Sequence, residues 1–83
     1  MNFGEAIEAA KSGKLVRRVG WNGKGMHVYL EDALSVRVRG GALKGEVRKY
    51  DPFFVMFTAK GTHQAGWLAS QADMLSEDWE VTS

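Results

Sequence analysis

A short glycine-rich block, Trp21-Asn22-Gly23-Lys24-Gly25-Met26, restricts the fold more than any other stretch of this chain. It lies between two strand-like apolar runs, Leu15–Val19 and Met26–Leu30. An Asn-Gly pair between such runs is a strong hairpin signal, because both residues tolerate positive φ angles. A bare hairpin turn requires neither the preceding tryptophan nor the following Lys24-Gly25. The block therefore predicts a pair of antiparallel strands and, beside it, a place where a ligand could be held.

The first residues predict a helix over 2–12. Asn2 can accept a hydrogen bond at its N-terminus, and Glu5 stands at the capping-box spacing. One apolar stripe continues through the segment at helical spacing: Phe3, Ala6, Ile7 and Ala10. Gly13 suits the position after the last turn, where positive φ is common. The segment is therefore expected to pack one face against a core.

The later segments predict a sheet. Residues 53–58, Phe-Phe-Val-Met-Phe-Thr, are almost continuously apolar, which suits a central strand buried on both faces. Further strands are expected at residues 14–19, 26–30, 35–39, 42–50, 62–65 and 79–81. We expect Val47 to face inward and Trp79 to lie in the core.

A second capping box, Ser70 with Asp73, predicts a short helix over 71–76. Met74 and Leu75 would then face the core. The fold expected from these elements is α+β. It combines an antiparallel sheet of about five or six strands with an N-terminal helix and a short C-terminal helix.

Length and composition indicate a single domain, residues 1–83, without disulfides or a thiolate metal site, because the chain has no cysteine. A chain this short buries only roughly 60–65% of its unfolded surface, so partner subunits are the expected source of extra stability. The absence of cysteine fits a cytoplasmic protein. No long apolar run and no secretory leader are present, so we expect no membrane partner.

The net charge is only +1, but the charges are unevenly distributed. Arg37 to Lys49 contains five cations and one anion, whereas Asp73 to Glu80 contains four anions and no cation. These blocks could be solvated faces of opposite sign. They could equally form an anion site, or surfaces by which subunits pair basic against acidic.

No set of residues indicates catalysis. Ser70 lies outside a Gly-x-Ser-x-Gly elbow, and capping already explains it. His27 and His63 lack metal-ligand spacing, and Asp73 with Glu77 suits a solvated helix face. The expectation is a protein that is not an enzyme and that uses no metal and no cofactor.

Binding is better supported. Trp21 at a turn and Trp67 before a helix start could each stack on a nucleobase, although core or interface packing explains them equally well. Asn22 can pair with an adenine edge. These residue types suggest a nucleotide-like ligand.

Phosphates of such a ligand would need positive partners. The expected helix start at Ser70 and Gln71 offers backbone N–H groups to one phosphate. Arg17 or Arg18 could clamp a second one through two parallel hydrogen bonds.

Three blocks of the chain, residues 1–9, 16–26 and 67–79, resemble a family of small phage and prophage proteins. They read Met-Asn-Phe-Gly-Glu-Ala-Ile-Glu-Ala, Val-x-Arg-x-Gly-Trp-Asn-Gly-Lys-Gly-Met and Trp-Leu-Ala-Ser-Gln-Ala-Asp-Met-Leu-Ser-Glu-Asp-Trp. The family is that of the Thoeris anti-defence protein of the second type. The similarity covers nearly the whole chain, and residues 31–52 depart most from it.

The resemblance implies a non-enzymatic sponge. Such a protein would bind a bacterial immune signal, a cyclic ADP-ribose isomer, and withhold it from its effector in the host cytosol; related cyclic dinucleotides could also be bound. It further implies a homotetramer with ligand pockets at subunit interfaces. The matching blocks carry these pocket candidates: Trp21, Asn22, Gly23, Lys24, Ser70, Gln71 and Asp73.

The residues also leave other functions open. A single-stranded nucleic-acid module would use the cations around Tyr50, namely Arg37, Arg39, Arg48 and Lys49. The chain could also be an enzyme that degrades the nucleotide, or an inhibitor that binds a protein and no small ligand. If binding falls steeply as the salt concentration rises, the partner is a nucleic acid.

Overall fold

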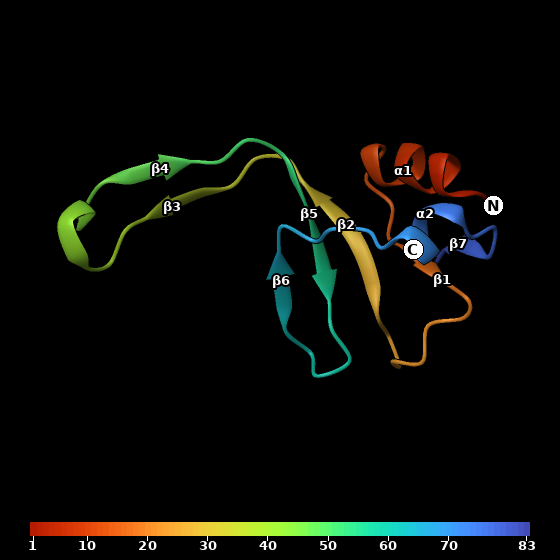
Figure 1. The fold of residues 1–83 in the computed structure, drawn as a ribbon. Coiled ribbons are helices and arrows are strands. Elements are labelled where there is room, and N and C mark those ends of the chain that lie inside the picture. Colours follow the sequence, from red (N-terminus) through yellow and green to blue (C-terminus); the bar gives the residue numbers. More distant parts are fainter.

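The computed structural model describes all 83 residues, and Figure 1 shows their arrangement. The elements in chain order are α1 (Phe3–Lys11), β1 (Val16–Arg18), β2 (His27–Glu31), β3 (Ser35–Arg37), a 3₁₀ turn (Gly41–Leu43), β4 (Val47–Lys49), β5 (Phe53–Phe57), β6 (His63–Ala65), α2 (Gln71–Leu75) and β7 (Trp79–Val81). One sheet has five strands in the order β6-β5-β2-β1-β7, and β3 with β4 forms a separate two-stranded sheet. All strand pairs are antiparallel. The predicted α+β class and both helices are confirmed.

Helix α1 begins as the sequence predicts. Asn2 accepts from the backbone N–H of Glu5, and the Glu5 carboxylate accepts from the N–H of Asn2. Gly13 follows the helix with φ of 95°. Ala6 and Ala10 are fully buried, because they point from the apolar side of α1 onto the five-stranded sheet.

The core lies between α1 and one face of that sheet, called here the covered face. Val16, Val28 and Met56 form a row across β1, β2 and β5, since each lies opposite the next in the strand register. Trp79 of β7 completes this cluster and is 2% exposed, which confirms its predicted place in the core. The opposite, open face carries the alternate residues of the same strands.

The tight Asn-Gly turn predicted between the first two strands is wrong, although the strands do pair. Residues 19–26 form a longer loop, in which no non-glycine residue has positive φ and Gly25 has φ of 76°. The chain leaves β1 toward β7, where the N–H of Val19 donates to the carbonyl of Asp78, and Trp21 packs against Trp79. Because of these contacts, the backbone does not follow the short path that a two-residue turn would take from β1 to β2.

Three burial predictions are also wrong. Met74 and Leu75 are 40% and 79% exposed, because α2 has only five residues and the residue it buries is Asp73. Val47 is 52% exposed, since no other element covers β4. Strand β5 is second in the sheet and β2 is central; within β5 only Val55 and Met56 are buried.

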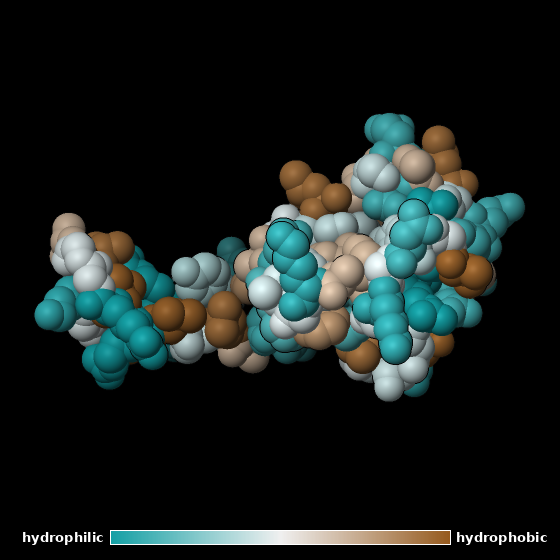
Figure 2. All heavy atoms as spheres, turned by 90° about the horizontal axis from the view of Figure 1, so that it is seen from below, coloured by the Kyte–Doolittle hydropathy of each residue, from teal (hydrophilic) through white to brown (hydrophobic).

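Residues 35–50, called here the arm, project from the ends of β2 and β5 (Figure 1). The principal extents of the chain are 44 × 25 × 24 Å. Seen from below, the arm extends to one side of the rest of the molecule and carries both hydrophilic and hydrophobic residues (Figure 2). The rest of the chain is called the body.

Candidate functional site

The two tryptophan blocks meet beside the core. The rings of Trp21 and Trp67 have centroids 6.3 Å apart at an interplanar angle of 75°, and both pack edge-on against Trp79. Trp21 and Trp67 are each only partly buried. The edge-to-face arrangement is favourable, because the positive edge of one ring meets the negative face of the next.

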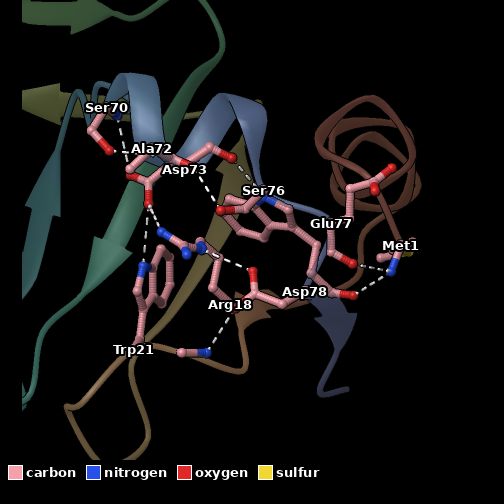
Figure 3. A network of polar contacts seen from close by, with 11 residues as sticks. Met1, Arg18, Trp21, Ser70, Ala72, Asp73, Ser76, Glu77 and Asp78 are labelled. Carbon is pink, nitrogen blue, oxygen red and sulfur yellow. Dashed lines mark hydrogen bonds and ion pairs between the residues drawn. The ribbon is translucent and has the colours of Figure 1, made fainter.

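Asp73 connects these blocks (Figure 3). Its Oδ1 accepts from Nη1 of Arg18 at 3.0 Å and from Nε1 of Trp21 at 3.3 Å. Its Oδ2 accepts from the backbone N–H of Ser70 at 3.1 Å, and the N–H of Asp73 donates to the Ser70 hydroxyl at 3.0 Å. The predicted capping box of α2 is therefore present. Its acid also holds a tryptophan 52 positions away in the sequence.

Arg18 lies between two carboxylates, as Figure 3 shows. Its Nε donates to Oδ1 of Asp78 at 2.9 Å, while Nη1 reaches Asp73. The other Asp78 oxygen accepts from the N–H of Gly20 at 2.9 Å. Trp79 adds a bond from its Nε1 to the carbonyl of Asp73 at 2.9 Å. This network ties α2, β7 and the loop after β1 into one unit.

The network shifts three pKa values. Burial by itself would raise the pKa of Asp73, but hydrogen bonds from the Ser70 backbone, Arg18, the Ser70 hydroxyl and Trp21 outweigh it, so this pKa is lowered. The pKa of Asp78 is lowered chiefly by the hydrogen bond from Arg18. Hydrogen bonds to Asp78 and then Asp73 raise the pKa of Arg18. All three groups are therefore charged at neutral pH.

The structure brings together Trp21, Trp67, Ser70 and Asp73 among the predicted site residues. Gly23 lies in the same loop as Trp21, where a Cβ atom would stand 2.0 Å from Sδ of Met26. The Cβ of Ala59 would lie 2.9 Å away, so the position is closed to any larger residue unless both Met26 and Ala59 shift.

The other predicted residues differ in their surroundings. Asn22, Lys24 and Gln71 are exposed on the loop after β1 and at the start of α2, and their side chains make no hydrogen bond or ion pair within the chain. Arg17 is not part of the cluster. It lies on the open face, because it alternates with Val16 and Arg18, and its Nη2 pairs with Glu80 at 2.6 Å.

Sequence reasoning missed the role of Asp78 and left Arg18 as one of two choices. It also missed a ring cluster on the open face. His27 stacks on Phe57 with centroids 4.9 Å apart, and the Tyr29 hydroxyl lies 2.9 Å from Nδ1 of His63. The signal was available, since odd-numbered positions of paired strands share a face and most of those in β2 and β5 carry rings.

The chain has two hollows, and neither is lined by a tryptophan. One of about 560 Å³ runs along the arm, lined by Arg37, Arg39 and Lys44 among others. The other, about 310 Å³, is lined by Tyr50, Phe53, Ala65 and Gly66. No group of His, Asp or Glu residues is arranged to hold a metal ion. No helix has the length and hydropathy needed to cross a lipid bilayer.

These features define a small α+β domain whose surface carries an indole pair held by an internal ion-pair network. The model of the Tad2-like family, described as the Thoeris anti-defense 2-like domain, matches residues 1–82, and the chain belongs to this family. A protein of Bacillus phage SP01 named Thoeris anti-defense 2 is 37% identical over 86 residues. That match covers 100% of this chain and 96% of the phage protein. Family membership associates the chain with phage anti-defence.

Proposed function

We propose that this protein is a non-enzymatic sponge that binds a cyclic ADP-ribose-type immune signal and keeps it from the defence effector. Related cyclic dinucleotides belong to the same ligand class. Membership of the Thoeris anti-defense 2-like family supports the anti-defence role. The observation that carries the ligand class is the indole pair Trp21–Trp67, which is partly exposed. The exposed side chains of Asn22 and Lys24 follow Trp21 on the same loop.

The residues divide into two groups in this proposal. Either Trp21 or Trp67 stacks on the adenine, which is worth about 1–3 kcal/mol, while the other indole, at 75° to it, contacts the base with its edge. Asn22, Lys24 and Gln71 supply the base-edge hydrogen bonds and a cation for phosphate. Their side chains are exposed and have no partner in the chain, so they lose no internal contact on binding.

In this proposal Asp73 and Ser70 do not contact the ligand but hold the site in shape. Both oxygens of Asp73 already accept hydrogen bonds from the protein, and the Ser70 hydroxyl caps α2. Together they hold Trp21 in one orientation before a ligand arrives. A preformed site binds more tightly, because less ordering is required on binding.

Sequestration needs no bond to be broken, so the protein acts by mass action. Each bound molecule is removed from the pool that activates the effector, in the host cytoplasm. In this proposal the copies form a homotetramer, and a second copy covers the ligand at each tryptophan pair. Neither hollow of a single chain is lined by a tryptophan, which is compatible with a site completed between copies.

Calorimetric titration with a panel of cyclic ADP-ribose isomers and cyclic dinucleotides tests the proposal. Lys24→Ala should weaken binding about tenfold, as expected for a lost charge-assisted hydrogen bond. Lys60→Ala removes another exposed lysine, at the β5–β6 turn, and should leave affinity unchanged. Trp21→Phe retains a ring but lacks the indole N–H, and should bind more weakly than wild type while remaining folded.

Heating the loaded protein distinguishes a sponge from an enzyme. After denaturation, chromatography should recover the ligand intact and in stoichiometric amount. Recovery of a cleaved ligand would show that the protein is an enzyme and would exclude sequestration as its mechanism. If no compound in the panel binds, cyclic ADP-ribose isomers and cyclic dinucleotides are excluded as ligands.

A further inference from the structure

Asn22 and Gly23 form a reactive pair of neighbours in the loop after β1. The side chain of Asn22 is exposed and makes no hydrogen bond within the chain, so its carboxamide is free to rotate. The backbone N–H of Gly23 donates no hydrogen bond either. Glycine has no Cβ atom, so nothing on residue 23 itself shields this nitrogen. A nitrogen and a carboxamide carbon therefore lie next to each other in the chain without competing partners.

This arrangement favours a reaction within the chain. Attack of the Gly23 nitrogen on Cγ of Asn22 closes a five-membered ring, and an intramolecular attack avoids the loss of freedom that two separate reactants suffer. A glutamine in place of Asn22 would need a six-membered ring, and a larger residue in place of Gly23 would hinder the attack. The pair thus combines the shorter carboxamide side chain with the least hindered backbone nitrogen.

Packing keeps a glycine at position 23. A Cβ atom there would stand 2.0 Å from Sδ of Met26 and 2.9 Å from the Cβ of Ala59. The carbonyl of Gly23 accepts from the N–H of Met26 at 3.3 Å, so the loop is fastened after the reactive nitrogen and not at it. The fold therefore requires the residue that leaves this nitrogen unshielded.

Asn2, the other asparagine of the chain, is in different surroundings. Its side-chain oxygen accepts from the backbone N–H of Glu5 at 2.8 Å, so its carboxamide is held in the cap of α1. The next residue, Phe3, is bulky and partly buried. Asn2 is therefore an internal reference, because its carboxamide is fixed and the nitrogen after it is hindered.

We propose that Asn22 is a site of spontaneous deamidation. The Gly23 nitrogen gives its proton to hydroxide and forms a bond to Cγ of Asn22, while the bond from Cγ to Nδ2 breaks and Nδ2 takes a proton from water and leaves as ammonia. Water then opens the cyclic imide: cleavage at Cγ gives aspartate, and cleavage at the backbone carbonyl carbon gives isoaspartate. One water is consumed and one ammonia is released, with no oxidant or reductant.

The product adds a negative charge to the loop that carries Trp21. Arg18 contributes one cation against the two carboxylates of Asp73 and Asp78, which leaves one net negative charge. The cation of Lys24 balances it, and a carboxylate at position 22 removes that balance. Because a carboxylate repels phosphate, conversion should weaken the binding of an anionic ligand. This consequence rests on the proposed function, whereas the reaction does not.

Peptide mapping of the whole protein tests the reaction. Trypsin cleaves after Arg18 and Lys24, so residues 19–24 are released as one short peptide. After incubation of the folded protein, mass spectrometry should show conversion of this peptide that rises with hydroxide concentration, since the attacking nitrogen must lose its proton. The peptide that contains Asn2 should stay unchanged. An unincubated sample gives the conversion caused by the digestion itself.

Two further measurements make the result decisive. Asn22→Gln retains a carboxamide but needs the larger ring, so the corresponding peptide should show no conversion. The same incubation in urea gives the behaviour of the unfolded chain. If Asn22 converts only in urea, the folded loop prevents the reaction and the proposal is overturned. Equal conversion at Asn2 and Asn22 in the folded protein also overturns it, because the surroundings of the two residues would then have no effect.

Calorimetry measures the consequence, with the panel compound that binds wild type best. The incubated protein and Asn22→Asp should each bind it about tenfold more weakly. Asn22→Ala loses the amide without adding a charge and should bind more tightly than Asn22→Asp; equal affinities would overturn the effect of the charge. If no panel compound binds while Asn22 converts, the proposed function fails and the deamidation site stands. Binding together with an intact Asn22 has the opposite meaning.

Discussion

Replacing Asp73 by Asn should destabilise the fold much more than loss of one surface charge does. The amide has the shape of the carboxylate, but one of its atoms becomes a donor. With the oxygen at the Oδ1 position, the nitrogen faces the N–H of Ser70, which loses its acceptor. With the opposite orientation, Arg18 and Trp21 lose theirs.

The magnitude follows from these contacts. Loss of the bond to the Ser70 N–H costs about 1 kcal/mol, as for other helix caps. Weakening the charged bond to Arg18 costs about 1–2 kcal/mol, since the side chain of Asp73 is only 12% exposed and is screened little by solvent. Arg18 keeps Asp78 as a partner, which limits the loss. The sum is about 2–3 kcal/mol, or roughly 10–20 °C in Tm for a domain of this size.

Urea denaturation followed by circular dichroism and tryptophan fluorescence measures this change. Protein concentration must be fixed, because assembly would contribute to apparent stability. Glu77→Gln is the matched control, since it removes the same charge four positions along the chain from an exposed side chain that has no partner. It should change stability by less than about 0.5 kcal/mol. If Asp73→Asn lies within that same range, the network does not hold the site together.

Two further outcomes follow from the same contacts. The pKa of Asp73 is lower in the folded chain than its ordinary 3.8, so its contribution to stability is complete above about pH 5 and disappears as the pH falls through the folded value. Arg18→Gln should therefore move the acid-unfolding midpoint, followed by circular dichroism, to higher pH; an unmoved midpoint would contradict this. Gly23→Ala should cost about 1–2 kcal/mol, chiefly by displacing Met26, whose Sδ would lie 2.0 Å from the new Cβ, and also by crowding the Cβ of Ala59 at 2.9 Å. In a Met26→Ala background the same change should cost less, and equal costs in urea melts would show that the two positions are not coupled.

Both helix starts could be predicted from sequence because their hydrogen bonds join residues three positions apart. Asn2 with Glu5 and Ser70 with Asp73 form capping boxes in the structure. Such contacts depend on local backbone geometry, which the residue types themselves favour. Most strand positions follow similarly, since period-two alternation is a local property. The strand expected over 42–50 is wrong in its first half, where the chain forms a 3₁₀ turn at Gly41–Leu43, and β4 covers only Val47–Lys49.

The loop after β1 shows where local reasoning fails. Asn-Gly allows a tight turn, but Trp21 is drawn toward Trp79 and Asp73, so the chain takes a longer path. The energy of burying an indole exceeds the small preference for one turn type. The conformation of the loop therefore depends on Asp73, 52 positions away, and the residues around the turn do not predict that contact.

The sequence alone determined the two capped helices, the run of strands, the basic arm segment and the absence of cysteine. The tertiary structure decided which of two adjacent arginines faces the core side. Alternation places Arg17 and Arg18 on opposite faces, but only the pairing of β1 with β7, in which Arg18 lies opposite Trp79, sets which one meets Asp73. It also decided that Asp73 is buried while its neighbours Met74 and Leu75 are exposed. The physical reason is that these choices depend on contacts between segments far apart in the chain, which form only when the sheet closes.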